Sequence, residues 1–232
     1  MNILELYEPP IGQHDVLNPK LWEARGVLKS EVQGALLRIA QDFLKFCEVD
    51  VDVVDIVITG GNANYTYTSH SDIDLHIVAD LSKVTCDREI NELFDTKRLL
   101  YREQRDVNIH KIPVELYVED VRMPAVSGGC YSVLKKSWVK RPIQADFEYD
   151  ETRVKELVDK WHTLIKQAIK SKNADLGRRI MTLIRKFRQR GLDTKQGEFS
   201  VPNLVFKSLR NDESIRQLQH LLDLDHDSRL SI

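Results

Sequence analysis

Cysteine is scarce in this 232-residue sequence, and the cysteines that occur are poorly placed for a cross-linked or zinc-bound fold. There are three, Cys47, Cys86 and Cys130, which lie far apart and form no C-x-x-C pair. An odd number of widely spaced cysteines excludes a disulfide framework and a zinc finger. Because unpaired thiols persist in reducing compartments, we expect the protein to be cytoplasmic.

Signals for export and for membrane insertion are also missing. The first residues, MNILELYEPPIGQHD, contain no positively charged segment followed by an apolar run, so no secretory signal is expected. Nowhere do about 18 apolar residues follow one another, which argues against a membrane helix and a membrane partner. The formal net charge of -2 creates no whole-protein field toward nucleic acid, so any basic surface must be local. The sequence leaves the oligomeric state open.

The first part of the chain carries a mixed pattern of helices and strands. With 42% hydrophobic residues, the chain is long enough to bury a large core. Apolar residues at three- and four-residue spacing predict helices over residues 30–47 and 88–104, the first with a capping box formed by Ser30 and Gln33. β-Branched or alternating segments predict strands at residues 51–59, 72–78, 112–118 and 130–139.

Charged helical periodicity replaces these strands from about residue 146. Helices are expected over residues 151–169, 176–190, 200–210 and 214–222, followed by a frayed end. Asp150 is the expected cap of the first of them, Gly191 is expected to end the second, and Pro202 fits the first turn of the third.

Together these elements predict the fold class. We expect an α/β fold of the α+β kind, with a short mixed sheet and flanking helices in residues 1–145. A helical domain is expected in residues 146–232.

Two aspartates share one face of the second predicted strand. Side chains alternate along a strand, so Asp72 and Asp74 point away from its apolar face, about 7 Å apart along the chain. Such carboxylates repel each other unless a cation joins them, and oxygen ligands suit Mg²⁺ or Mn²⁺. Glu115, on the outer face of the third strand, would add a third carboxylate if the two strands are neighbours. His76 shares the aspartate face, but we interpret it as a polar neighbour because hard cations prefer oxygen.

A glycine pair followed by small polar residues precedes this strand. Gly60 and Gly61 end the first strand, where the absence of Cβ atoms allows backbone N–H groups to approach a phosphate closely. Further hydrogen-bonding groups come from Asn62, Asn64, Thr66, Thr68, Ser69 and Ser71. The stretch predicts a triphosphate cradle followed by a metal clamp.

This arrangement resembles the nucleotidyltransferase fold of the DNA polymerase beta superfamily, which carries Gly-Ser, a spacer, Asp-x-Asp and a third acidic residue on a later strand. Here Gly60-Gly61 is followed by ten residues, by Asp72-Ile73-Asp74 and later by Glu115. The resemblance covers residues 53–118. It implies that Asp72 and Asp74 hold two metal ions, and that Glu115 holds the catalytic ion and helps to activate the attacking hydroxyl.

The same resemblance implies an activity and a role for the helical domain. The reaction would transfer a nucleoside monophosphate from an NTP, with ATP as the expected donor, to an acceptor hydroxyl, and would release pyrophosphate. The helical domain would close a cleft over the nucleotide. In its helical part the chain more loosely resembles phage-encoded nucleotidyltransferases.

One position departs from the family pattern. Gly61 stands where the family has a serine whose hydroxyl contacts nucleotide phosphate, as in the glycine pair of tRNA-terminal nucleotidyltransferases. The loop lacks the arginine of those enzymes, so we do not expect this chain to have their CCA-adding activity. Ser69 or Ser71 is available to supply the missing hydroxyl.

A basic run in the helical part offers a local charged surface. Nine basic residues accompany a single acid, Asp175, between residues 166 and 190: Lys166, Lys170, Lys172, Arg178, Arg179, Arg185, Lys186, Arg188 and Arg190. Such a run is either a solvated helix face or a surface for phosphates, and Arg185 is our candidate for the latter. Lys135 and Lys136, on the fourth predicted strand, are further candidates for the triphosphate. We favour RNA as the acceptor and keep a protein hydroxyl or a small molecule as alternatives.

Other interpretations of the acidic residues stay open. An Asp-x-Asp pair alone is often the solvated face of an edge strand. An inactive descendant of the family, binding nucleic acid or a protein partner, is consistent with Gly61. A phosphohydrolase would use the same carboxylates with water as the acceptor.

Overall fold

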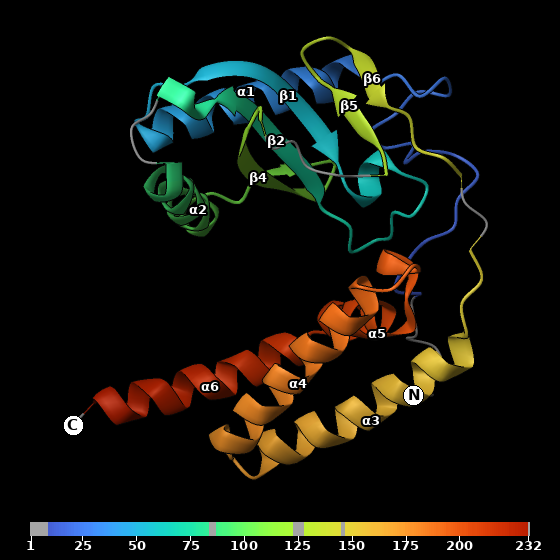
Figure 1. Cartoon of the computed structure of the whole chain (residues 1–232), viewed down its shortest axis with the longest axis vertical. Coiled ribbons are helices and arrows are strands. Elements are labelled where there is room, and N and C mark those ends of the chain that lie inside the picture. The colour runs from blue at the N-terminus through green and yellow to red at the C-terminus, as the bar shows by residue number, and fades with distance from the viewer. Residues whose placement is uncertain (1–8, 84–86, 123–127, 145–146, 232) are drawn as a thin grey trace. The chain divides into compact units, whose positions relative to one another are not determined.

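The computed structural model describes residues 9–83, 87–122, 128–144 and 147–231 (Figure 1). The chain divides into two compact units. One is Gly12–Ala145, and the other is Asp146–Ile232 together with the N-terminal residues up to Ile11. Within the described ranges, no helix combines the length and the apolar character needed to cross a membrane.

The unit Gly12–Ala145 is built around a six-stranded sheet with the strand order β3-β4-β2-β1-β5-β6 (Figure 1). Its strands are β1 (Asp52–Thr59), β2 (Ile73–Asp80), β3 (Asn108–Ile109), β4 (Ile112–Asp120), β5 (Cys130–Ser132) and β6 (Ser137–Lys140). β2 and β4 run parallel, and the other neighbouring pairs are antiparallel. These strands agree with the predicted mixed sheet and α+β class, and they place β2 between β1 and β4.

Two helices, α1 (Ser30–Cys47) and α2 (Asp87–Gln104), pack on one face of this sheet. On β2, Ile73, Leu75 and Ile77 are fully buried in a core that also contains residues of both helices. Burying one such side chain contributes about 2 kcal/mol, and a slip of one residue would turn all three toward solvent. The apolar residues of β2 therefore decide which way its polar side chains point.

The start of α1 differs from the sequence prediction. Lys29 is the N-cap residue, and no side chain caps this end of the helix. Ser30 is already helical, and Nε2 of Gln33 donates to the carbonyl of Val133 at 2.7 Å. The predicted capping box is therefore wrong, because a contact distant in the chain holds the glutamine.

The strand predicted over residues 130–139 is also wrong in detail, since the segment is a hairpin. β5 and β6 pair antiparallel, with Tyr131 opposite Trp138. The turn between them contains Lys136 in the left-handed region, with φ of 54°. Tyr131 and Trp138 make an edge-to-face contact with ring centroids 5.2 Å apart, and both pack against Trp22. Aromatic pairing across the strands thus favours a reversal of the chain over one continuous strand.

The second unit contains four α-helices among its described residues, α3 (Glu151–Lys170), α4 (Ala174–Leu192), α5 (Val201–Asn211) and α6 (Ser214–Leu230). Oδ1 of Asp150 accepts a hydrogen bond from the backbone N–H of Arg153 at 2.8 Å, so the predicted cap is confirmed. Pro202 lies in the first turn of α5, as predicted. Ile11 is buried in the core of this unit.

Two helix ends in this unit lie beyond their predicted positions. Gly191 is inside α4. A Cβ at residue 191 would be only 2.8 Å from the Cβ of Pro202, which lies in the first turn of α5, so no larger residue fits there. The glycine therefore permits close helix packing and does not end the helix. The segment expected to fray continues as α6 to Leu230, where Nε of Arg229 lies 3.1 Å from Oδ2 of Asp225.

Candidate metal centre

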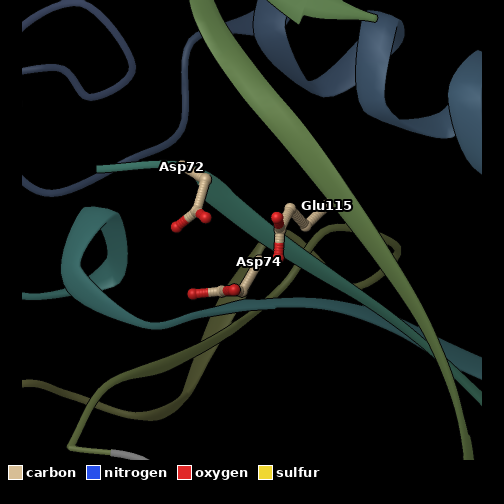
Figure 2. Close-up of side chains that lie close together, drawn as sticks. All are labelled: Asp72, Asp74 and Glu115. Atoms are coloured by element: carbon tan, nitrogen blue, oxygen red, sulfur yellow. The ribbon is translucent and has the colours of Figure 1, made fainter. Parts of the chain in front are cut away.

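Three carboxylates meet where β2 begins beside β4. Asp74 on β2 is directly opposite Glu115 on β4 in the parallel register, and Asp72 lies just before β2. One oxygen of each of the three carboxylates lies within 4.8 Å of the others (Figure 2). All three side chains are half-buried. The structure therefore brings together the three acidic residues that the sequence singled out.

Alternation along the two strands explains this convergence. Asp74 lies between the buried residues Ile73 and Leu75, so its side chain points to the opposite face of the sheet. On β4, Leu116 is buried in the same core, and Glu115 therefore points to the face that carries Asp74. In a parallel pair with this register, the two carboxylates are lateral neighbours.

The donor set fits a hard divalent cation. The ligand oxygens of one Mg²⁺ ion lie about 2.1 Å from the metal, so they are separated by up to about 4.2 Å. The three ligand oxygens lie within 4.8 Å of one another, a range that suits one ion or two ions sharing the cluster. Asp72, Asp74 and Glu115 are the residues that would hold such ions.

Glu115 is oriented by two residues that the sequence analysis missed. Nη1 of Arg102 donates to its Oε1 at 2.9 Å, and the hydroxyl of Tyr117 donates to its Oε2 at 2.8 Å. Burial raises the pKa of Tyr117 above its usual value, and the hydrogen bond to Glu115 raises it further. Tyr117 therefore stays a neutral donor. The two-residue spacing from Glu115 could have indicated Tyr117, but nothing local connects Arg102 on α2 to β4.

His76 is held away from a ligand role by its own partners. Its Nε2 lies 2.9 Å from Oγ1 of Thr59, and its Nδ1 lies 2.6 Å from Oε1 of Glu119. Its ring stacks on Tyr117, with centroids 4.7 Å apart. Both ring nitrogens are engaged, which fits the interpretation of His76 as a polar neighbour.

The glycine turn is in direct contact with the carboxylate cluster. Gly60 has φ of 73° and ψ of -160°, a conformation that essentially only glycine adopts. A Cβ at residue 60 would overlap Oδ2 of Asp74. At Gly61 a Cβ would lie 3.3 Å from Oγ of Ser71. The two glycines thus let the backbone turn against Asp74 and Ser71.

The polar run after the glycines includes a structural support that is buried. The side-chain nitrogen of Asn62 donates to the carbonyl of Asp72 at 2.7 Å, and its oxygen accepts from Asn18 at 2.8 Å. Nε1 of Trp22 donates to the carbonyl of Asn62 at 2.8 Å. Asn62 therefore holds the backbone of Asp72 and is not available to a ligand. The contributions of Asn18 and Trp22 come from a distant segment and had no signal in the local sequence.

The two candidate serines differ in their surroundings. Oγ of Ser71 accepts from the backbone N–H of Thr68 at 2.9 Å and is the hydroxyl that lies next to Gly61. Ser69 is exposed on the same loop. Of the two serines, the geometry therefore favours Ser71 as the hydroxyl that lies next to Gly61.

The two candidate lysines, Lys135 and Lys136, are not part of this cluster. Lys135 is in the β5–β6 turn, where its Nζ lies 2.9 Å from Oδ2 of Asp55, and Lys136 is exposed beside it. Asp55 precedes Thr59 by four residues on β1, which corresponds to about 13 Å along the strand from the residue that pairs with Asp74. The structure therefore does not bring the lysine pair to the carboxylates.

The basic run is divided between exposed and engaged side chains within the helical unit. Arg178 donates to Asp175 and Asp225 at 2.7 and 2.9 Å. Arg188 donates to Oδ1 of Asn203 at 3.2 Å, and its guanidinium carbon lies 4.2 Å from the centroid of the Phe206 ring. Exposed basic side chains on α4 are those of Arg179, Arg185, Lys186 and Arg190.

Comparisons with protein-family models, with curated proteins and with solved structures give no match for this chain. The case for a function therefore depends on the geometry of the site.

Proposed function

We propose that the protein is a metal-dependent nucleotidyltransferase with the fold of the DNA polymerase beta superfamily. It transfers a nucleoside monophosphate from an NTP, with ATP as the donor, to the hydroxyl of an acceptor. The observation that carries the proposal is the convergence of Asp72, Asp74 and Glu115 next to a glycine turn that contacts Asp74. Carboxylates alone are common on protein surfaces, but this combination matches the needs of phosphoryl transfer.

The carboxylates supply the binding site for Mg²⁺ or Mn²⁺. When bound, such ions lower the pKa of an attacking hydroxyl and stabilise the charge on leaving pyrophosphate. The chain's own residues orient the cluster: Arg102 and Tyr117 hold Glu115, and Asn62 holds the backbone of Asp72. A preorganised cluster of this kind lowers the barrier because it does not reorganise during the reaction.

The transfer itself balances without a further reactant. The acceptor oxygen forms a bond to the α-phosphorus, and the bond from that phosphorus to the α,β-bridging oxygen breaks. The bridging oxygen leaves with the electron pair as part of pyrophosphate, and the hydroxyl proton passes to solvent. The backbone at Gly60 and Gly61, with Ser71 beside it, is the proposed cradle for the leaving phosphates.

We propose an RNA end as the acceptor. The exposed basic side chains of α4 support this choice, because each of them can contact a phosphate of an RNA backbone. A protein hydroxyl and a small molecule are the competing acceptors.

One observation favours a second candidate function. At Gly61 the hydroxyl of the family serine is missing, so an inactive module that binds nucleic acid or a protein is the alternative. Against it stands the presence of all three carboxylates in one cluster, which repel each other in the absence of a cation.

Product analysis separates these functions. The protein is incubated with ATP labelled at the α-phosphate, Mg²⁺ and total RNA, and both the labelled products and the released phosphate species are separated. Label in RNA with release of pyrophosphate supports the transferase. Labelled AMP with pyrophosphate, or labelled ADP with phosphate, and no labelled acceptor, would indicate hydrolysis instead. An absence of turnover with RNA, and in parallel incubations with protein and with small-molecule acceptors, would support the inactive module.

A further inference from the structure

A cavity borders the carboxylate cluster on the side of β4. It has a volume of about 350 Å³ and is lined by both α2 and β4. Three arginines, Arg98, Arg102 and Arg105, lie at four- and three-residue spacing and share one face of α2 and its end. Glu115 lines the same cavity. The cavity thus connects a cluster of guanidinium groups to one member of the metal centre.

The three arginines retain hydrogen-bonding capacity toward the cavity. Arg102 uses Nη1 for Glu115 and is 71% exposed, and a guanidinium has five N–H donors. Arg105 is half exposed, with its Nε 3.8 Å from Oδ2 of Asp42, a distance too long for a hydrogen bond. Arg98 lies over the ring of Tyr117, and its buried Nε is 3.7 Å from Oδ1 of Asp95, which is an ion pair but too long for a hydrogen bond.

The two acids that line the cavity offset only part of this charge, since Glu115 pairs with Arg102 at 2.9 Å and three arginines face two carboxylates. Asp106 accepts a hydrogen bond from Asn108 at 2.7 Å, and Glu115 belongs to the metal centre. Three guanidinium groups around one small cavity match a phosphate better than a carboxylate, because a phosphate brings more oxygens and up to two negative charges.

The position of the cavity relative to the glycine turn indicates which reactant it serves. β2 lies between β1, which ends at the glycine turn, and β4, which borders the cavity. In phosphoryl transfer the attacking and leaving oxygens are roughly in line on opposite sides of the phosphorus. If the leaving phosphates lie at the turn beside β1, the attacking hydroxyl enters from the side of β4.

We propose that the arginine cavity binds a phosphate ester of the acceptor, so that a hydroxyl one sugar away from this phosphate lies beside Glu115. This proposal rests on the proposed function for its assignment to the acceptor. The phosphate belongs either to the last nucleotide of an RNA or to a free sugar phosphate, and the chemistry recognised is the same.

The test is a binding measurement that needs no turnover. Fluorescein-labelled hexauridylate is titrated with the full chain in EDTA and low salt, and its anisotropy is followed. Competition with ribose 5-phosphate, and with ribose as the control without phosphate, is measured in parallel. Arg105→Gln and Arg102→Gln are compared with Arg38→Gln, which removes the charge of an exposed arginine on α1 of the same unit.

The expected result is a loss of affinity of more than tenfold in Arg105→Gln and Arg102→Gln, with Arg38→Gln unchanged. Stabilisation of Arg105→Gln by ATP and Mg²⁺ stays as in the wild type. Effective competition by ribose 5-phosphate identifies a sugar phosphate as sufficient, whereas competition by RNA alone identifies the RNA end.

Two outcomes overturn the proposal. If Arg105→Gln loses its stabilisation by ATP and keeps its affinity for hexauridylate, the cavity serves the donor triphosphate. If neither property changes, the arginines support only α2 and β4. Because binding is measured in EDTA, failure here is distinguishable from failure of the proposed function, which product analysis detects.

Discussion

Gly60 and Asp74 are so close that a methyl group at residue 60 would overlap the carboxylate oxygen Oδ2 of Asp74. Gly60 also has a positive φ of 73°. The turn at the end of β1 and the carboxylate on β2 are therefore coupled, and a change in one displaces the other.

The first prediction follows from this contact. Gly60→Ala should lower the free energy of unfolding by at least about 2 kcal/mol and abolish stabilisation by Mg²⁺, because the new Cβ is strained and displaces Asp74. Urea denaturation with and without Mg²⁺ measures both effects. Gly61→Ala is the matched control, since its Cβ would lie 3.3 Å from the Ser71 hydroxyl and its φ is not positive. Equal losses in the two variants would contradict the coupling.

The second prediction concerns the carboxylates themselves. Asp72→Asn and Asp74→Asn should each abolish transfer and leave the fold intact or up to about 1 kcal/mol more stable without metal, because removing one charge relieves repulsion. Transfer from labelled ATP and thermal melting followed by circular dichroism are the measurements. Glu103→Gln, an exposed charge change on α2, should affect neither. Near-normal transfer by either aspartate variant, or its unfolding, would show that the pair is not a metal clamp.

Ligand-dependent stability gives a third prediction. ATP with Mg²⁺ at 1 mM should stabilise the wild-type protein by about 1.5 to 3 kcal/mol if the dissociation constant is between about 10 and 100 μM. Asp72→Asn should lose the part of this stabilisation that depends on metal. Differential scanning fluorimetry with ATP alone, Mg²⁺ alone and both ligands separates these contributions. An unchanged melting temperature in the wild type would favour the inactive module.

The exposed basic face of α4 leads to a fourth prediction. Arg185→Glu with Lys186→Glu should weaken RNA binding and reduce its dependence on salt, because fewer counterions are released. Affinity measured between 50 and 200 mM salt tests this. The charge-matched control, Arg153→Glu with Lys160→Glu on α3, should change little. If the two double variants behave alike, the basic run is only a solvated helix face.

Arg188 should behave differently from its exposed neighbours. Its contacts with Asn203 and Phe206 predict that Arg188→Ala lowers the free energy of unfolding by about 1 to 2 kcal/mol. Urea denaturation of Arg188→Ala and of Arg185→Ala measures the difference between their free energies of unfolding. A larger loss for Arg185→Ala would contradict the separation of the basic run into exposed and engaged residues.

The last prediction concerns alkaline pH. Burial raises the pKa of Cys47 from 9.0 to about 11. Below pH 9 this contribution to stability is fully present, and it is lost as the pH rises toward 11 because the unfolded chain releases the proton first. Between pH 8 and pH 11 the wild type should lose about 2 kcal/mol more than Cys47→Ala, as measured by urea denaturation at each pH. An equal loss in both proteins would show that another group is responsible.

Local periodicity predicted most of the elements. The alternation around Asp74 and the helical spacing of α1 depend on neighbours within a few residues, so the strand, the helix and the face of each aspartate could be read directly. The positive φ at Gly60 likewise follows from a residue type that tolerates it. The ends of α4 at Leu192 and of α6 at Leu230 were not predicted: close packing of Gly191 against Pro202 overrode the glycine signal, and an ion pair between Arg229 and Asp225 accompanies the longer α6.

By itself, the sequence determined which residues belong to strands and which face of β2 carries Asp72 and Asp74. Only the tertiary structure decided that Glu115 lies opposite Asp74, that Arg102 reaches Glu115, and that Lys135 pairs with Asp55 far along β1. The physical reason is that side-chain alternation is a property of the local backbone. Strand order, register and helix docking are chosen by burial of the whole core, which combines segments distant in the chain.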